Sequence, residues 1–128
     1  MLEMELPIVH VNVSEVAAQS DRYQRLRAEI WYNCREWFER KDVTIAKDIV
    51  LLGKLVDELC SVEAKYTSLG KADIESKDVM RGRGVKSPNI ADALCLTFAM
   101  GGATRLGSYQ EGWGTKINTL SYLAPGVV

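Results

Sequence analysis

The clearest pattern of apolar positions along the chain lies between residues 20 and 40. Five apolar side chains recur there at steps of three and four residues, namely Tyr23, Leu26, Ile30, Cys34 and Trp37. This spacing puts them on one face of a helix, with charged residues over the remaining surface. Ser20 or Asp21 can accept the first backbone hydrogen bonds. We therefore predict a helix that begins at Ser20 or Asp21, ends near Arg40, and packs on a core.

A second apolar pattern follows Asp48, which can cap the helix that the pattern predicts. Its apolar positions are Leu51, Leu52, Leu55, Val56 and Leu59. The short alternating runs 63–67 and 72–76 are separated by a turn and predict a β-hairpin. A further strand is predicted over 7–13, where β-branched residues partly alternate. His10 in that strand fits a surface position better than a catalytic one.

The last predicted helix starts at Ser87-Pro88, a serine cap followed by proline at the first helical position. It continues to Met100, and Gly101-Gly102 stops it. Beyond this point the chain contains glycine, serine, threonine and isolated aromatic residues without periodicity. We expect one folded unit over 1–102 and an irregular tail over 103–128, ordered only against a partner.

Composition describes one ordinary globular domain of 128 residues, 47% apolar and 26% charged. These values exclude a disordered tail, a collagen-like chain and a coiled-coil rod. The net charge of −1 means that any contact with nucleic acid is local. A local basic segment exists over 77–86, where two glycines predict a turn at the end. Four basic residues and one acidic residue give it +3, so the rest carries −4; the basic residues are Lys77, Arg81, Arg83 and Lys86.

The three cysteines, Cys34, Cys60 and Cys95, lie far apart and each falls in an apolar run. Without a CxxC motif and with a single histidine, they are expected to be free core residues rather than zinc ligands. No apolar run reaches the length of a membrane span. The first five residues lack the basic region of a signal peptide, so we expect the cytoplasm and no membrane partner.

Asp92 is the candidate for chemistry. It lies in the first turns of a nearly apolar helix and faces away from Ile90 and Leu94, with Asn89 one turn before it on the same side. A carboxylate near a helix N-terminus stays ionised, and ionised oxygen is the ligand that Mg²⁺ requires. We expect its charge to have no fixed cationic partner, so that its removal is neutral for stability. The alternative is an acid that merely favours the start of a helix.

Two motifs together resemble the nuclease domain of bacteriophage terminase large subunits. One is Tyr23 followed by the Arg-Ala-Glu-Ile-Trp sequence of 27–31. The other is a hairpin, the Glu-Ser-Lys-Asp sequence of 75–78, a basic turn, and the Ser-Pro-Asn-Ile-Ala-Asp-Ala-Leu sequence of 87–94. The motifs lie about sixty residues apart, and the resemblance covers roughly residues 7–100.

This resemblance implies an α+β, partial ribonuclease H-like fold with a short mixed sheet and three to four helices. It also implies hydrolysis of DNA during genome packaging at a two-metal site that binds Mg²⁺ or Mn²⁺. Asp92 and Asn89 would be metal ligands, and Lys77 would lie near the scissile phosphate. Independently of the resemblance, the +3 charge of segment 77–86 predicts that any DNA binding is weak and involves Lys77, Arg81, Arg83 and Lys86. The setting would be a bacterial host that carries a prophage.

The chain departs from this pattern in three respects. Asn89 stands where many relatives have aspartate, no acidic strand precedes Pro7, and no GxxxxGK[ST] motif is present. We therefore expect a fragment that is inactive alone, and that forms a homo-oligomer or joins a missing N-terminal portion. One alternative is a non-enzymatic module that dimerises through an exposed sheet edge. Another is an unrelated α+β enzyme.

Overall fold

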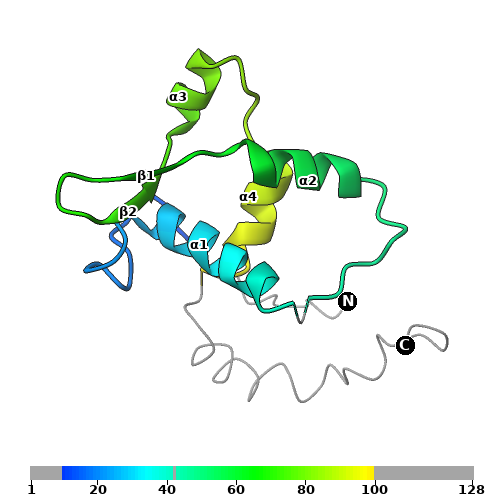
Figure 1. The fold of residues 1–128 in the computed structure, drawn as a ribbon, viewed down its shortest axis with the longest axis horizontal. Coiled ribbons are helices and arrows are strands. Elements are labelled where there is room, and N and C mark those ends of the chain that lie inside the picture. The colour runs from blue at the N-terminus through cyan, green and yellow to red at the C-terminus, as the bar shows by residue number, and fades with distance from the viewer. Residues whose placement is uncertain (1–9, 42, 100–128) are drawn as a thin grey trace, which may run out of the picture.

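The computed structural model describes residues 10–41 and 43–99 (Figure 1). The described residues form four helices and a two-stranded sheet. In chain order these are α1 (Leu26–Glu39), α2 (Leu52–Ser61), β1 (Ala64–Tyr66), β2 (Ala72–Ile74), α3 (Lys77–Gly82) and α4 (Asn89–Leu96). The predicted α+β class and helix number are confirmed. No helix among these residues is long and apolar enough to cross a membrane.

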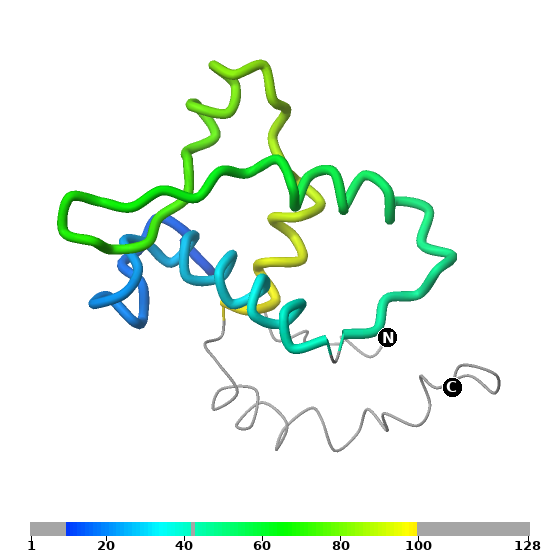
Figure 2. Tube along the Cα trace, in the orientation of Figure 1, coloured from blue at the N-terminus to red at the C-terminus, as the bar shows by residue number. Residues whose placement is uncertain are grey.

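The core lies where α1, α2, β2 and α4 meet. α1 and α4 cross near the centre of the fold, and α2 covers the start of α4 (Figures 1 and 2). The buried members of this core are Ile30, Trp31, Cys34, Leu55, Ile74, Ala91, Cys95 and Ala99. Two of the three cysteines are core residues as predicted, but Cys60 is exposed on α2. The apolar run around Cys60 gave no indication of which helix face it occupies.

The predicted hairpin is confirmed as the antiparallel pair β1 and β2. Its register pairs Ala64 with Ile74 and Tyr66 with Ala72. A parallel bridge links Ala72 to Tyr23, because the Ala72 amide donates to the Arg22 carbonyl at 2.8 Å. This bridge covers the outer edge of β2 at Ala72, while the sheet itself is the antiparallel pair of β1 and β2.

Helix α1 begins at Leu26 and not at Ser20 or Asp21, because a buried carboxylate holds the preceding residues in turns. Glu29 accepts hydrogen bonds from the backbone amides of Ala18 (2.7 Å) and Gln19 (3.1 Å). Glu29 is only 3% exposed. Glu29, which belongs to the Arg-Ala-Glu-Ile-Trp motif, thus stabilises the loop before α1. Neither Ser20 nor Asp21 caps the helix.

The starts of α2 and α4 also differ from prediction. α2 begins at Leu52, not after Asp48, and no side chain caps it. α4 begins at Asn89 with Pro88 in the cap position, and the Ser87 side chain makes no cap bond. Its cap comes from α2, where Glu58 accepts from the amides of Ile90 (2.7 Å) and Ala91 (2.9 Å). A carboxylate at a helix N-terminus satisfies free N–H groups and favours the helix dipole.

The segment predicted as a basic turn contains helix α3. Ser76 caps it by accepting from the Val79 amide at 3.3 Å, and Gly84 ends the segment with φ of 76°. α3 lies at the top of Figure 1, and its Met80 side chain is buried. The strand predicted over 7–13 is absent from 10–13, while 7–9, Met100 and the tail lie outside the described residues.

Candidate functional site

The two sequence motifs meet at the side chain of Asp92. The indole Nε1 of Trp31 in α1 donates a hydrogen bond to Asp92 Oδ1 at 3.0 Å. The ammonium of Lys77, at the start of α3, lies 2.7 Å from Asp92 Oδ2. The guanidinium of Arg27, also in α1, lies 3.8 Å from Oδ1. We call Arg27, Trp31, Lys77 and Asp92 the Asp92 cluster.

The prediction that Asp92 lacks a fixed cationic partner is wrong. Two cations flank its carboxylate, whose side chain is only 18% exposed. The error comes from α3, since a helix in place of a turn brings Lys77 against α4. Lys77 lies fifteen positions before Asp92 in another helix, so the helical periodicity around Asp92 does not predict this partner.

Arg27 holds the cluster to the end of the hairpin. Its Nη1 donates to the backbone carbonyl of Glu75 at 2.7 Å, and its side chain is 14% exposed. Nε and Nη2 are buried without a hydrogen-bond partner. Arg27, Glu29 and Trp31 therefore contact three different parts of the fold. This explains physically why the Arg-Ala-Glu-Ile-Trp motif accompanies the motif that contains Asp92.

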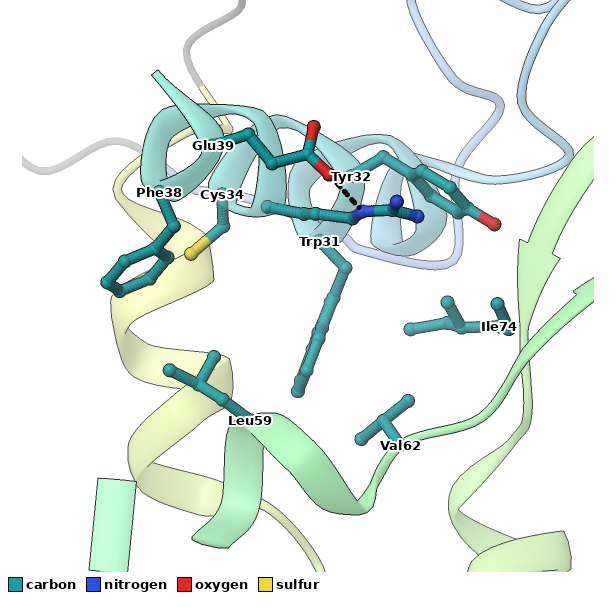
Figure 3. A pocket seen from close by; sticks show the side chains of 10 residues that line it. Trp31, Tyr32, Cys34, Phe38, Glu39, Leu59, Val62 and Ile74 are labelled. Carbon is teal, nitrogen blue, oxygen red and sulfur yellow. Dashed lines mark hydrogen bonds and ion pairs between the residues drawn. The ribbon is translucent and has the colours of Figure 1, made fainter. Parts of the chain in front are cut away.

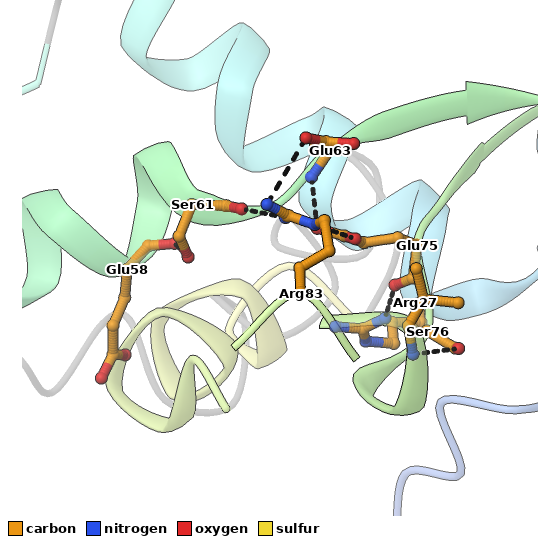
Figure 4. Close-up of polar contacts among 8 residues, drawn as sticks. Arg27, Glu58, Ser61, Glu63, Glu75, Ser76 and Arg83 are labelled. Atoms are coloured by element: carbon orange, nitrogen blue, oxygen red, sulfur yellow. Dashed lines mark hydrogen bonds and ion pairs between the residues drawn. The ribbon is translucent and has the colours of Figure 1, made fainter. Parts of the chain in front are cut away.

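Arg83, predicted to contact DNA, is instead bound to carboxylates of this chain (Figure 4). Its guanidinium forms a two-armed contact with Glu75, in which Nε lies 3.1 Å from Oε2, and Nη1 lies 3.5 Å from Glu63. Nη2 also donates to the Ser61 carbonyl at 2.9 Å. Glu75 is 4% exposed. The hydrogen bond from Arg83 lowers the pKa of Glu75. Arg83 thus joins α2 to the hairpin.

The other predicted site residues are exposed and lie outside the Asp92 cluster. Arg81 pairs with Asp78 one turn earlier at 3.3 Å, and both side chains are largely in solvent. Lys86 is exposed in the loop after α3. Asn89 is exposed as well, and within the described residues its side chain does not take part in the Asp92 cluster.

A divalent metal requires several oxygen ligands around one point. Among the described residues, no group of three or more His, Cys, Asp or Glu side chains could hold a metal ion. Both oxygens of Asp92 already face N–H donors or cations. The described residues alone therefore do not fit a divalent metal, and Asp92 and Asn89 do not form a metal site by themselves.

This α+β arrangement is consistent with part of a ribonuclease H-like nuclease domain, and comparison with known structures agrees. The nuclease domain of the large terminase subunit gp2 of bacterial virus Sf6 is 26% identical with a TM-score of 0.51, over 60% of this chain and 41% of that chain. The resemblance to terminase nuclease domains seen in the sequence is confirmed as a partial structural match. No protein-family model and no curated protein sequence matches the chain.

Two further structures of that domain carry a lysine-to-alanine substitution. The one with manganese is 23% identical with a TM-score of 0.50, over 65% of this chain and 46% of that chain. The one with calcium is 24% identical with a TM-score of 0.50, over 64% and 46%. These two similarities show the fold. The matched part spans less than half of each of these domains.

Asp92→Asn is expected to destabilise the protein by about 1–3 kcal/mol in metal-free buffer, because it leaves two partly buried cations without a counter-charge. An amide still offers Trp31 an oxygen, so the variant isolates the effect of the charge. Urea denaturation measures the difference. Asp78→Ala, at an exposed acid of α3, is the matched control and should lie within about 0.5 kcal/mol of wild type. Equal midpoints for Asp92→Asn and wild type would contradict a structural role.

Glu75 should make the fold sensitive to acid. Its pKa is lower in the folded protein than its ordinary value, so it contributes stability at neutral pH that is lost as the pH falls through the folded pKa. Glu75→Gln should therefore be less stable than wild type at pH 7, and the difference should shrink toward pH ~3. Urea midpoints measured across this range test it. A difference that stays constant with pH would show that the charge is not involved.

Proposed function

We propose that this chain forms part of a terminase-type nuclease domain that acts on DNA, in the cytoplasm of a bacterial host. The observation that carries the proposal is the Asp92 cluster. It joins the two motifs of the resemblance through the Trp31–Asp92 hydrogen bond and the Lys77–Asp92 ion pair. The partial match to a terminase nuclease domain supports the same conclusion.

In this proposal the chain contributes some of the residues of a nuclease centre. Asp92 is the acidic residue that the chain supplies to this centre. The side chain of Lys77 is 43% exposed and can reach a phosphate oxygen while it is bound to Asp92. Divalent metal ions would need further carboxylates from polypeptide outside the described residues. Manganese and calcium in the structures of the similar domain support a divalent metal in the complete site. Lys77 and Arg27 would hold the Asp92 carboxylate in place.

The proposed DNA contact lies on α3 and the loop that follows it. Lys77, Arg81 and Lys86 are positive groups there, and α3 projects from the fold (Figure 1). Arg83 belongs to the same stretch of sequence, but Glu75 and Glu63 offset its charge. We therefore assign the phosphate contacts to Lys77, Arg81 and Lys86, and give Arg83 a structural role.

The isolated chain is expected to show no cleavage of plasmid DNA with Mn²⁺, because one carboxylate does not make a two-metal centre. The measurement is conversion of supercoiled plasmid to nicked or linear product over a titration of protein. Cleavage that persists through purification and disappears in Asp92→Ala would contradict the proposed inactivity. It would also identify the chain as a complete nuclease.

The double variant Arg81→Ala, Lys86→Ala should weaken binding to duplex DNA at low salt. It should also make the slope of log affinity against log salt less negative, by about 0.9 for each phosphate that the variant no longer neutralises. Fluorescence anisotropy with a labelled duplex measures both quantities. The double variant Arg35→Ala, Arg40→Ala is the matched control, because it removes the same charge from exposed i,i+4 pairs on α1. Equal affinity in wild type and both variants would rule out this surface.

The exposed edge of β1 favours a second candidate function, an interaction module that dimerises. All three residues of β1 are exposed, and Tyr66 (70%) and Leu69 (81%) carry apolar surface beside that edge. The edge of β2 is covered by the bridge to Tyr23, so β1 is the edge that another strand could join. Light scattering that shows a stable dimer, together with calorimetry that shows no Mn²⁺ binding, would favour this candidate over the first.

A further inference from the structure

Cys34 and Cys95 lie opposite each other where α1 crosses α4. Two contacts on either side locate the pair. One turn before it, Trp31 of α1 bonds Asp92 of α4, and one turn after it, the rings of Trp37 and Phe98 lie 5.7 Å apart. Each cysteine thus sits three residues after one contacting residue and three residues before the next. Both side chains are buried, at 1% and 0% exposure.

Both cysteines belong to the same buried core cluster, and each thiol shifts the pKa of the other. The neighbouring Cys95 thiol lowers the pKa of Cys34, whereas the Cys34 thiol and burial raise the pKa of Cys95. Cys34 is therefore the member of the pair that carries thiolate more readily. Thiolate is the form of cysteine that reacts with peroxides and disulfides.

Cys34 is one of the residues that line a cavity of about 470 Å³. Figure 3 shows the Cys34 sulfur among the side chains that line it, between Phe38 on α1 and Leu59 on α2. The other cavity-lining residues come from α1, the end of α2 and the hairpin. Cys95 does not line this cavity. Cys34 is therefore the member of the pair that lines the cavity.

We propose that Cys34 and Cys95 form a redox modification site that hydrogen peroxide converts into a disulfide between α1 and α4. The Cys34 thiolate attacks one peroxide oxygen and the O–O bond breaks, which gives Cys34 sulfenic acid and hydroxide; the hydroxide takes up a proton. The Cys95 sulfur then attacks the Cys34 sulfur, an S–S bond forms, and the sulfenic oxygen leaves as water with the thiol proton. Two thiols and one peroxide thus give one disulfide and two waters.

The disulfide would act on the Asp92 cluster because it lies one helical turn away on both helices. A covalent link between positions 34 and 95 would fix the crossing of α1 and α4 that sets the Trp31–Asp92 contact. Cys60 is exposed on α2 and takes no part in the pair. It supplies an internal comparison, because it is the thiol most open to solvent.

The test uses full-length chain with Cys60→Ser, so that the two remaining thiols are the proposed pair. After native exposure to hydrogen peroxide and removal of excess oxidant, thiols are titrated in denaturant without reductant. We expect two thiols per chain to fall to none, and dithiothreitol to restore both. Trypsin digestion followed by mass spectrometry should show the peptide 28–35 linked to the peptide 87–105. A non-reducing gel should show the monomer.

The proposal is overturned if both thiols survive peroxide, if Cys34 becomes sulfinic acid without a cross-link, or if disulfides form only between chains. In a second variant, Cys60→Ser with Cys95→Ala, Cys34 lacks its resolving partner. Dimedone should then label Cys34 as sulfenic acid, and absence of label would count against the first step. Should that variant fail to fold, peptide mapping of the wild type decides the question, because there the 34–95 link must form in preference to links through Cys60.

Discussion

The Asp92 carboxylate binds donors from two widely separated parts of the chain, and the arrangement of the helices depends on it. Trp31 and Arg27 approach from α1, and Lys77 approaches from α3. Burying an ionised carboxylate costs free energy, and the two neighbouring cations offset that cost for Asp92. The same group stabilises the fold and, in our proposal, faces DNA. A residue with both roles constrains the choice of its neighbours more than either role would alone.

Three further carboxylates, two of them buried, connect the remaining segments in the same manner. Glu29 holds the loop before α1, Glu58 caps α4 from α2, and Glu75 binds Arg83. Each acid satisfies backbone N–H groups or a cation that would otherwise be buried unpaired. In this small fold, acidic side chains therefore connect segments that long paired strands would connect in a larger sheet. The described strands contain only three residues each.

Sequence periodicity predicted α1, α2, the hairpin and α4, because each has a local signal of its own. It did not predict α3, because the helix has only six residues and the nearby glycines indicate a turn. The cap that Ser76 provides is evident only in the structure. The sequence named Asp92 and Lys77 as candidate site residues, but it did not predict that Trp31 and Lys77 bind the Asp92 carboxylate. Charge counting grouped Arg83 with the residues expected to contact DNA, whereas Glu75 binds it. Ion pairs between distant segments have no periodicity, so a single sequence does not disclose them.

The separation of contacts along the chain also bears on the order in which the fold forms. The hairpin closes a short loop, and Glu58 reaches the start of α4 across 32 positions. Trp31 reaches Asp92 across 61 positions. Because closing a longer loop costs more entropy, the hairpin and the α2–α4 contact form more readily than the contact between α1 and α4. The indole of Trp31 therefore enters its final environment late, and its fluorescence reports the completion of folding.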